Sequence, residues 1–116
     1  MQKNSLNRVI LIGRLGKTPE GRYTPSGIAV ASFSLATNES WNNKQGLKEH
    51  TEWHNIVAWE KLADFANEYL YKGQLVNIEG LLRTRQWEDK EHKTTKKITE
   101  IICTTISPLE WKSEAK

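Results

Sequence analysis

Hydrophobic and polar residues alternate along several short stretches of the chain, which is the pattern of half-buried β-strands. The clearest stretch is residues 28–37, where the odd positions from Ala29 to Leu35 are apolar and the other face carries Ser32 and Ser34. Similar stretches recur between turn residues. We therefore expect five strands, at residues 6–15, 28–37, 51–59, 75–87 and 97–106.

One segment between the third and fourth strands has a helical period instead. Its apolar residues are spaced as on one face of a helix, at Leu62, Phe65, Ala66, Tyr69 and Leu70. Gly73 follows where a C-terminal cap is expected. Gly80 interrupts the fourth strand and predicts a bulge or bend.

Polar segments separate these elements. Thr24–Gly27 has the Pro and Gly of a turn. Asn38–His50 is polar almost throughout and predicts a long hairpin loop, while Glu88–Thr95 predicts a charged loop tip. In the last strand we expect Ile98, Ile102 and Ile106 on one side, and Ile101 and Cys103 on the other.

Three strands, one helix and two strands make an all-β protein with the topology of the OB-fold. This is a five-stranded Greek-key barrel whose helix lies between strands 3 and 4. The 116 residues suffice for one domain, which we place at residues 1–110, with a short remnant at 111–116. No apolar run is long enough for a signal peptide or a membrane span, so we expect no membrane partner.

Composition adds one unusual feature to this pattern. The chain has five Trp against three Tyr and two Phe, although Trp is the aromatic residue least easily buried in full. The net charge of +3 is compatible with nucleic-acid binding but does not establish it. A single cysteine excludes an internal disulfide framework.

Tryptophan and arginine share faces of two predicted strands. Trp53 and Trp59 are six residues apart on one strand, and Arg83, Arg85 and Trp87 are spaced by two on another. Because arginine cannot lose its charge, a core position for this second face would be costly. Indoles that stack bases and guanidiniums that follow phosphates are typical of sites for single-stranded nucleic acid.

Trp41 fits the same pattern, because it stands in a polar segment that offers it no core. Each feature also has a simpler interpretation. A strand Trp can belong to the core, the two arginines can pair with Glu79 or Glu88, and Trp41 can fold back over the barrel end. The combination of these features favours a ligand-binding face.

The sequence contains no recognisable catalytic arrangement. A phosphate-binding glycine loop must be followed by a helix, and Gly13 and Gly16 are not. The three histidines have no other metal-ligating residues at suitable spacing. Cys103 lies in an apolar strand, as an inert small hydrophobic residue would. We expect no enzyme activity, no cofactor and no metal site.

Four stretches resemble the bacterial-type single-stranded DNA-binding protein (SSB) family, which also occurs in phages, plasmids and organelles. They are NRVILIGRLG at 7–16, SFSLATNESW at 32–41, TEWHNIVAW at 51–59 and YLYKGQLVNIEGLLRTRQW at 69–87. The resemblance covers most of residues 6–106. It implies non-enzymatic, sequence-tolerant binding of single-stranded DNA in replication, recombination and repair.

The resemblance also implies roles for individual residues. The family's base-stacking aromatics fall on Trp41, Trp53, Trp59 and Trp87, with Trp59 where the family often has Phe. Basic positions along the DNA path match Arg22, Lys44, Lys61, Lys72, Arg83 and Arg85. His54 matches a position at the family's subunit interface, and Gln86 stands where some relatives have Lys.

The family usually forms homotetramers, and a dimer is the alternative. Val9, Leu11 and Ile28 are candidates for an apolar interface. Many bacterial members end in an acidic tip that recruits other proteins. This chain ends without one, so recruitment through a tail is not expected. The resemblance implies a cytoplasmic bacterial, phage or plasmid protein, or a mature organellar one.

Two other functions are compatible with an OB-fold. One is a primosome-type module that acts mainly through protein contacts, which predicts weak DNA binding and a dimer. The other is an oligosaccharide-binding barrel, which would carry carboxylates and amides where this chain has Arg83 and Arg85.

Overall fold

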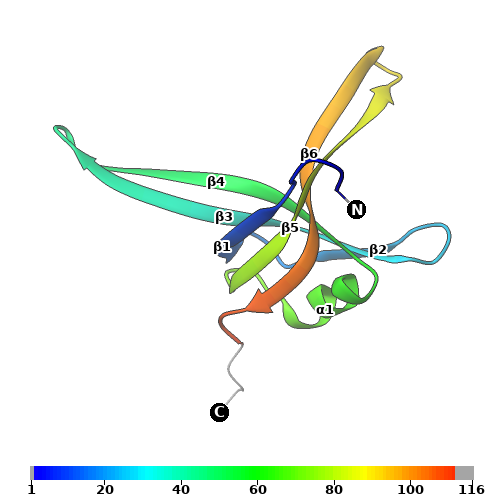
Figure 1. Ribbon diagram of the computed structural model, residues 1–116, viewed down its shortest axis with the longest axis horizontal. Coiled ribbons are helices and arrows are strands. Elements are labelled where there is room, and N and C mark those ends of the chain that lie inside the picture. Colours follow the sequence, from blue (N-terminus) through cyan, green and yellow to red (C-terminus); the bar gives the residue numbers. More distant parts are fainter. Residues whose placement is uncertain (1, 112–116) are drawn as a thin grey trace.

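A computed structural model describes residues 2–111 of the chain. Six strands and one helix follow one another in it (Figure 1). The elements are β1 (Val9–Leu15), β2 (Glu20–Tyr23), β3 (Ala29–Asn43), β4 (Gly46–Trp59), α1 (Lys61–Tyr69), β5 (Leu75–Asp89) and β6 (Thr94–Pro108). The predicted helix is confirmed, and each predicted strand lies within or overlaps an observed one.

Five of the strands close into a barrel. The order is β1-β5-β6-β4-β3, and β3 returns to β1 through the pairs Arg14–Ala36 and Leu15–Leu35. All neighbours are antiparallel except β4 and β6. The short strand β2 pairs only with β3, outside the closed ring. This arrangement confirms the OB-fold and adds β2, which the sequence did not predict because all four of its residues are exposed.

The barrel core consists of side chains from alternating strand positions and one helix face. Ala31, Phe33 and Leu35 of β3 point inward as predicted, and Ile56, Ile78 and Ile101 meet them from other strands. The helix adds Ala63 and Ala66. The alternation seen in the sequence therefore decides which strand face becomes the interior.

Two hairpins extend well beyond the barrel (Figure 1). The prediction of a loop at Asn38–His50 is wrong, because β3 and β4 stay paired as far as Asn43 and Gly46. Strands β5 and β6 likewise pair as far as Asp89 and Thr94, so the second loop is shorter than predicted. Water reaches both faces of such a ribbon, so neither face needs apolar residues.

Gly80 marks a bulge, as predicted. The pairing register shifts between Glu79 and Gly80, and a Cβ on Gly80 would lie 2.1 Å from the carbonyl oxygen of Ile102. The bulge changes the alternation of β6. Ile106 packs against the core together with Ile101 and Cys103, so its predicted place on the opposite side is wrong.

Gly73 does not cap the helix, contrary to the prediction. The C-cap residue is Leu70, in an extended conformation, and Gly73 lies in the following turn with φ of 87°. Its N–H donates to the carbonyl oxygen of Leu15, which joins this turn to β1.

The apolar outer face of β1 differs from the prediction. Val9 and Leu11 pack against the barrel's own core, whereas Ile10 and Ile12 are each 57% exposed. The prediction of Val9 and Leu11 as interface residues is therefore wrong, because the strand alternation turns them inward. Ile28 is exposed at the start of β3.

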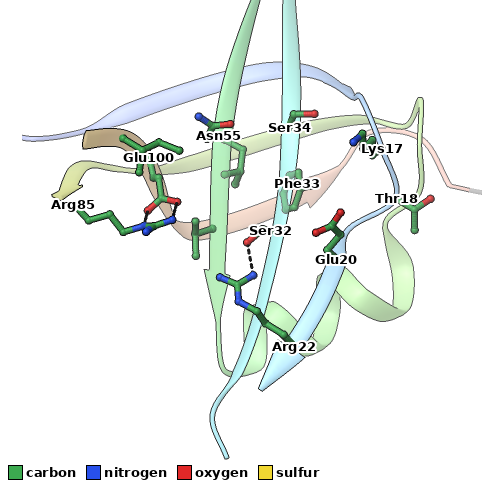
Figure 2. Close-up of a pocket in the computed structure, with 13 residues that line it drawn as sticks. Lys17, Thr18, Glu20, Arg22, Ser32, Phe33, Ser34, Asn55, Arg85 and Glu100 are labelled. Atoms are coloured by element: carbon green, nitrogen blue, oxygen red, sulfur yellow. Dashed lines mark hydrogen bonds and ion pairs between the residues drawn. The ribbon is translucent and has the colours of Figure 1, made fainter. Parts of the chain in front are cut away.

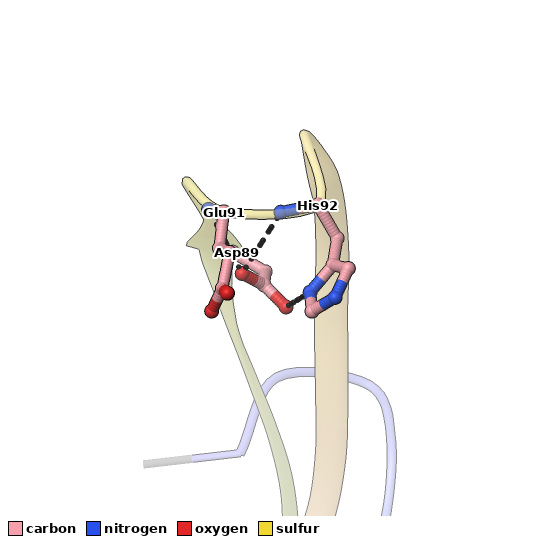
Figure 3. Close-up of side chains that lie close together, drawn as sticks. All are labelled: Asp89, Glu91 and His92. Atoms are coloured by element: carbon pink, nitrogen blue, oxygen red, sulfur yellow. Dashed lines mark hydrogen bonds and ion pairs between the residues drawn. The ribbon is translucent and has the colours of Figure 1, made fainter.

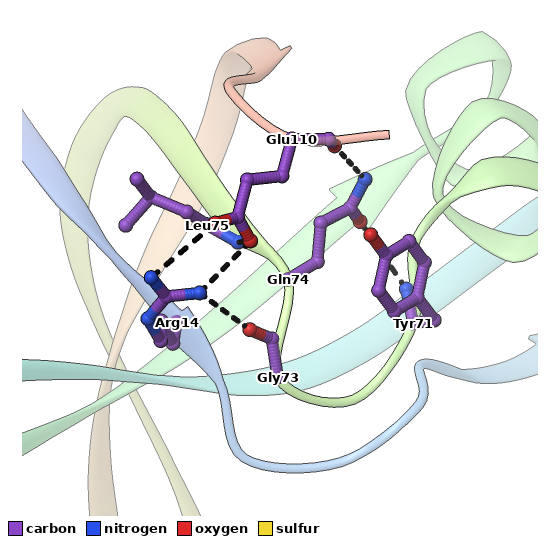
Figure 4. A network of polar contacts seen from close by, with 6 residues as sticks. All are labelled: Arg14, Tyr71, Gly73, Gln74, Leu75 and Glu110. Carbon is purple, nitrogen blue, oxygen red and sulfur yellow. Dashed lines mark hydrogen bonds and ion pairs between the residues drawn. The ribbon is translucent and has the colours of Figure 1, made fainter. Parts of the chain in front are cut away.

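A polar network joins the last described residues to the barrel (Figure 4). The Arg14 guanidinium donates to the Glu110 carboxylate and to the carbonyl oxygen of Gly73, and the Gln74 amide donates to the carbonyl oxygen of Glu110. The bond from Arg14 holds the pKa of Glu110 below its usual value. Trp111 packs edge-on against Phe65 and Tyr69 of α1. The remnant predicted at 111–116 otherwise lies outside the described residues.

Candidate nucleic-acid interface

The outer surface of the barrel gathers aromatic and basic residues from separate strands. In β4, Ile56 and Ala58 point into the core, so Trp53, Val57 and Trp59 point outward. In β5, Arg83, Arg85 and Trp87 share the outward side, opposite the face of Ile78 and Gly80. This confirms that each predicted set shares one strand face.

The indoles on this surface are open to solvent. Trp53, Trp59 and Trp87 are 57%, 41% and 45% exposed. Indoles that served only to fill the core would be almost fully covered. Their exposure leaves aromatic surface available for a ligand.

A groove runs over this surface between β2, β4, β5 and β6 (Figure 2). Its lining includes Arg22, Asn55, Arg85 and Glu100. An adjoining hollow shares Arg22, Arg85 and Glu100 with the groove and adds Trp59 and Arg83. Strands far apart in the sequence therefore place an indole and three guanidiniums around one continuous depression.

Trp53 lies beside this groove, packed over Gly16. A Cβ on Gly16 would come within 2.5 Å of the Trp53 ring and 2.7 Å of the Ser34 hydroxyl. Ser34 and Lys17 both line the groove. Gly16 is therefore needed for close approach, because any larger residue would displace the indole.

Two cations at the groove come from the segment around β2. The Arg22 guanidinium donates to the Ser32 hydroxyl at 2.9 Å, which holds it against β3. Lys17 also lines the groove. The sequence reasoning missed Lys17, because it lies in a connection without alternation, and it gave no role to Asn55 and Glu100.

Arg85 is the most constrained basic side chain of the groove. Its Nε donates to a Glu100 carboxylate oxygen at 2.9 Å, and its Cζ lies 5.2 Å from the centre of the Trp87 ring. The sequence reasoning considered Glu79 and Glu88 as partners of the two arginines. Glu79 instead pairs with Arg8, and Glu100 is the partner of Arg85.

Trp87 does not line the groove but lies next to Arg85, which does, and the remaining predicted residues do not line it either. Trp41 lies on the arm formed by the paired ends of β3 and β4, where it is paired with Lys48. Lys48 and Trp53 are five residues apart on β4 and therefore point to opposite faces, so Trp41 lies on the ribbon face opposite Trp53. Lys44 lies at the tip of that arm. Lys61 begins α1, and the N–H of Lys72 donates to the hydroxyl of Thr18 at the groove.

His54 lies on the ribbon face of Trp41, away from Trp53 and Trp59. Its Nε2 lies 2.9 Å from the Thr37 hydroxyl of the paired strand, on the ribbon face opposite Trp53. The half-buried ring is thus held by a neighbour in its own chain.

Two histidines have acidic neighbours that the sequence pattern did not indicate: His50 lies 3.5 Å from Glu52, and His92 lies beside Asp89. Ligand atoms of Asp89, Glu91 and His92 lie within 4.8 Å of one another at the β5–β6 tip (Figure 3). Asp89 accepts from the His92 ring and from the N–H of Glu91, and these bonds hold its pKa below its usual value. The carboxylate therefore already closes the turn.

Known proteins resemble this chain in sequence and in fold. The profile described as "Single-strand binding protein family" matches residues 6–109. The single-stranded DNA-binding protein 1 of Chlorobaculum tepidum is 52% identical over 105 residues, which cover 90% of this chain and 65% of that protein. The single-stranded DNA-binding protein of Neisseria meningitidis is 54% identical over 88 residues, which cover 75% of this chain and 51% of that protein.

A solved structure, titled "Plasmodium falciparum SSB complex with ssDNA", has a TM-score of 0.82 and 39% identity to this chain. The match covers 95% of this chain and all of that one. The topology defines an OB-fold protein. The chain belongs to the single-strand binding protein family. It spans about half to two thirds of the length of the curated relatives it matches. No helix within residues 2–111 is long and apolar enough to cross a membrane.

Proposed function

We propose that this protein binds single-stranded DNA with little sequence preference, and protects it during replication, recombination and repair. The observation that carries the proposal is the outer groove, which combines the exposed indole of Trp59 with Arg22, Arg83 and Lys17. The family membership and the titled DNA complex of a structural neighbour support it.

The mechanism follows from the two kinds of side chain. Exposed indoles stack bases at about 1–3 kcal/mol per base, independently of base identity because every base has a π-face. Cations contact the phosphates, and each contact adds roughly −0.7 to the slope of the logarithm of the binding constant against the logarithm of the salt concentration. Duplex DNA binds poorly in this scheme, because its bases already stack on one another.

Removal of one indole at a time tests this function. Trp53→Ala and Trp87→Ala each remove a stacking surface, so each should weaken binding to oligo-dT by about 5- to 150-fold, as expected for about 1–3 kcal/mol. Tryptophan fluorescence titration measures the affinity and the quenching on binding. Trp111→Ala is the matched control, because this indole packs on α1.

Two outcomes would contradict the proposed function. One is unchanged affinity in both of these variants, Trp53→Ala and Trp87→Ala, and the other is wild-type protein that binds duplex as tightly as oligo-dT.

We further propose a homotetramer, with exposed Ile10 and Ile12 and the position of His54 as candidate contacts between subunits. Native mass spectrometry gives the number of subunits, with and without poly-dT. A dimer that binds oligo-dT only weakly would instead favour a primosome-type module. The proposal involves no catalysis and places the protein in the cytoplasm, where it meets DNA.

A further inference from the structure

Arg85 lies at the groove but is already bound on two sides. Its Nε and Nη2 donate to the two carboxylate oxygens of Glu100 at 2.9 and 3.4 Å. Its Cζ lies 5.2 Å from the centre of the Trp87 ring, within the distance of a cation–π contact. Figure 2 shows the guanidinium turned toward Glu100.

Glu100 is unexpected in a groove that receives a polyanion. Its side chain is only 11% exposed, and it lines both hollows of the groove. Arg83 is its direct partner across the strands, yet the only ion pair of Glu100 within residues 2–111 is with Arg85. A nearly buried carboxylate needs a compensating charge, and a forked guanidinium–carboxylate contact supplies it.

Arg85 cannot give its full charge to Glu100 and to a phosphate at the same time. The pairing also fixes the guanidinium plane next to Trp87, whose direct partner across the strands is Lys96. The cations left outside any ion pair of residues 2–111 are Lys17, Arg22 and Arg83 at the groove. The arginines of this surface therefore divide into two kinds.

We propose that Glu100 is a positioning residue that holds Arg85 against Trp87, so that Arg85 orients the stacking indole and does not neutralise a phosphate. The phosphate contacts then belong to Lys17, Arg22 and Arg83. This inference rests on the proposed binding of single-stranded DNA and assigns separate tasks to residues within that site.

The salt dependence of oligo-dT binding distinguishes the two roles of Arg85. Glu100→Gln keeps the side-chain size and removes the charge, so the freed guanidinium should add one phosphate contact. The slope of log K against log salt should then steepen by about 0.7. In the double variant Arg85→Gln/Glu100→Gln, the net charge and the slope should equal those of the wild type.

Glu79→Gln is the matched control, because it removes the same charge from the Arg8 pair on the β1–β5 side of the barrel. Its slope should remain that of the wild type. An unchanged slope in Glu100→Gln, or a double variant whose slope is shallower by about 0.7, would overturn the proposal. An equal steepening in Glu79→Gln would also overturn it, because the effect would then be one of overall charge.

A second measurement needs no DNA. The Nε–H resonance of Arg85, assigned by its loss in Arg85→Gln, should shift in the free Glu100→Gln protein, together with the indole N–H of Trp87. Absence of both shifts would show that Glu100 does not position Arg85. If the wild type failed to bind oligo-dT, the proposed function would be wrong. The resonance measurement would still decide whether Glu100 positions Arg85.

Discussion

At the scale of single residues, the site depends on contacts that strand alternation alone does not reveal. Alternation correctly predicted that Arg83, Arg85 and Trp87 share a face, because β5 is regular along this stretch. The partners of these residues come from elsewhere in the chain. Glu100 pairs with Arg85 only after β6 folds back on β5. A pattern along one strand contains no information on that register.

Gly16 provides a residue-scale prediction. Gly16→Ala would place a methyl group 2.5 Å from the Trp53 ring, and this exposed ring is freer to move than the backbone. The variant should therefore fold normally and bind oligo-dT more weakly, up to the loss seen in Trp53→Ala. Fluorescence titration measures the affinity, and circular dichroism checks the fold.

The double variant Gly16→Ala/Trp53→Ala controls for effects on the backbone. It should bind no more weakly than Trp53→Ala alone, because the methyl group then has no indole to displace. Additive losses in the double variant would contradict the packing of Trp53 over Gly16.

Cys103 provides a second residue-scale prediction. Burial raises the pKa of this thiol to about 12, so it stays protonated in the folded protein at pH 8. The reactive species toward a disulfide reagent is the thiolate. A colorimetric disulfide reagent should therefore react slowly with native protein and rapidly after denaturation. Immediate and complete reaction of the native protein would contradict a sealed core around Cys103.

At the scale of elements, the sequence predicts the strands of the barrel but not their continuation into the two hairpin arms. The barrel portions of β3 and β5 alternate because one side is buried. Residues 38–50 lack that alternation, since both faces of the arm meet water, and so they resemble a loop in the sequence. The strand β2 escapes prediction for the same reason. Hydrophobic patterning reports burial, and it finds strands only where burial accompanies them.

The β3–β4 arm gives an element-scale prediction. Trp41 lies on the ribbon face opposite Trp53, so a short oligo-dT that fills only the groove should not reach it. Trp41→Ala should therefore leave binding of a short oligonucleotide nearly unchanged and weaken binding of long poly-dT. Titration of both lengths by fluorescence anisotropy measures this difference.

Leu47→Ala is the control on the same arm, because Leu47 is exposed on the Trp53 side of the ribbon. It should affect neither length. A loss for the short oligonucleotide in Trp41→Ala as large as that in Trp53→Ala would contradict the placement of Trp41.

At the scale of the whole molecule, the site exists only when the barrel is closed. Arg22, Trp59, Arg83 and Glu100 come from four different strands and meet at one hollow. The core residues on the inner faces of β4, β5 and β6 determine where these outer residues lie. The fold class was predictable from spacing, and so were the shared strand faces of Trp53 and Trp59 and of Arg83 and Trp87. The placement of Arg22 of β2 around the same hollow as Arg83 of β5 was not predictable, because it depends on the three-dimensional closure.

We propose that Trp59, which lines the groove, stacks bases together with Trp53 and Trp87, which lie beside it. The most direct measurement is a titration of isotope-labelled protein with oligo-dT, followed through the five indole N–H resonances. Large shifts are expected for Trp53, Trp59 and Trp87, and almost none for Trp111. Shifts concentrated on Trp111, with the other three indoles unchanged, would contradict the proposal.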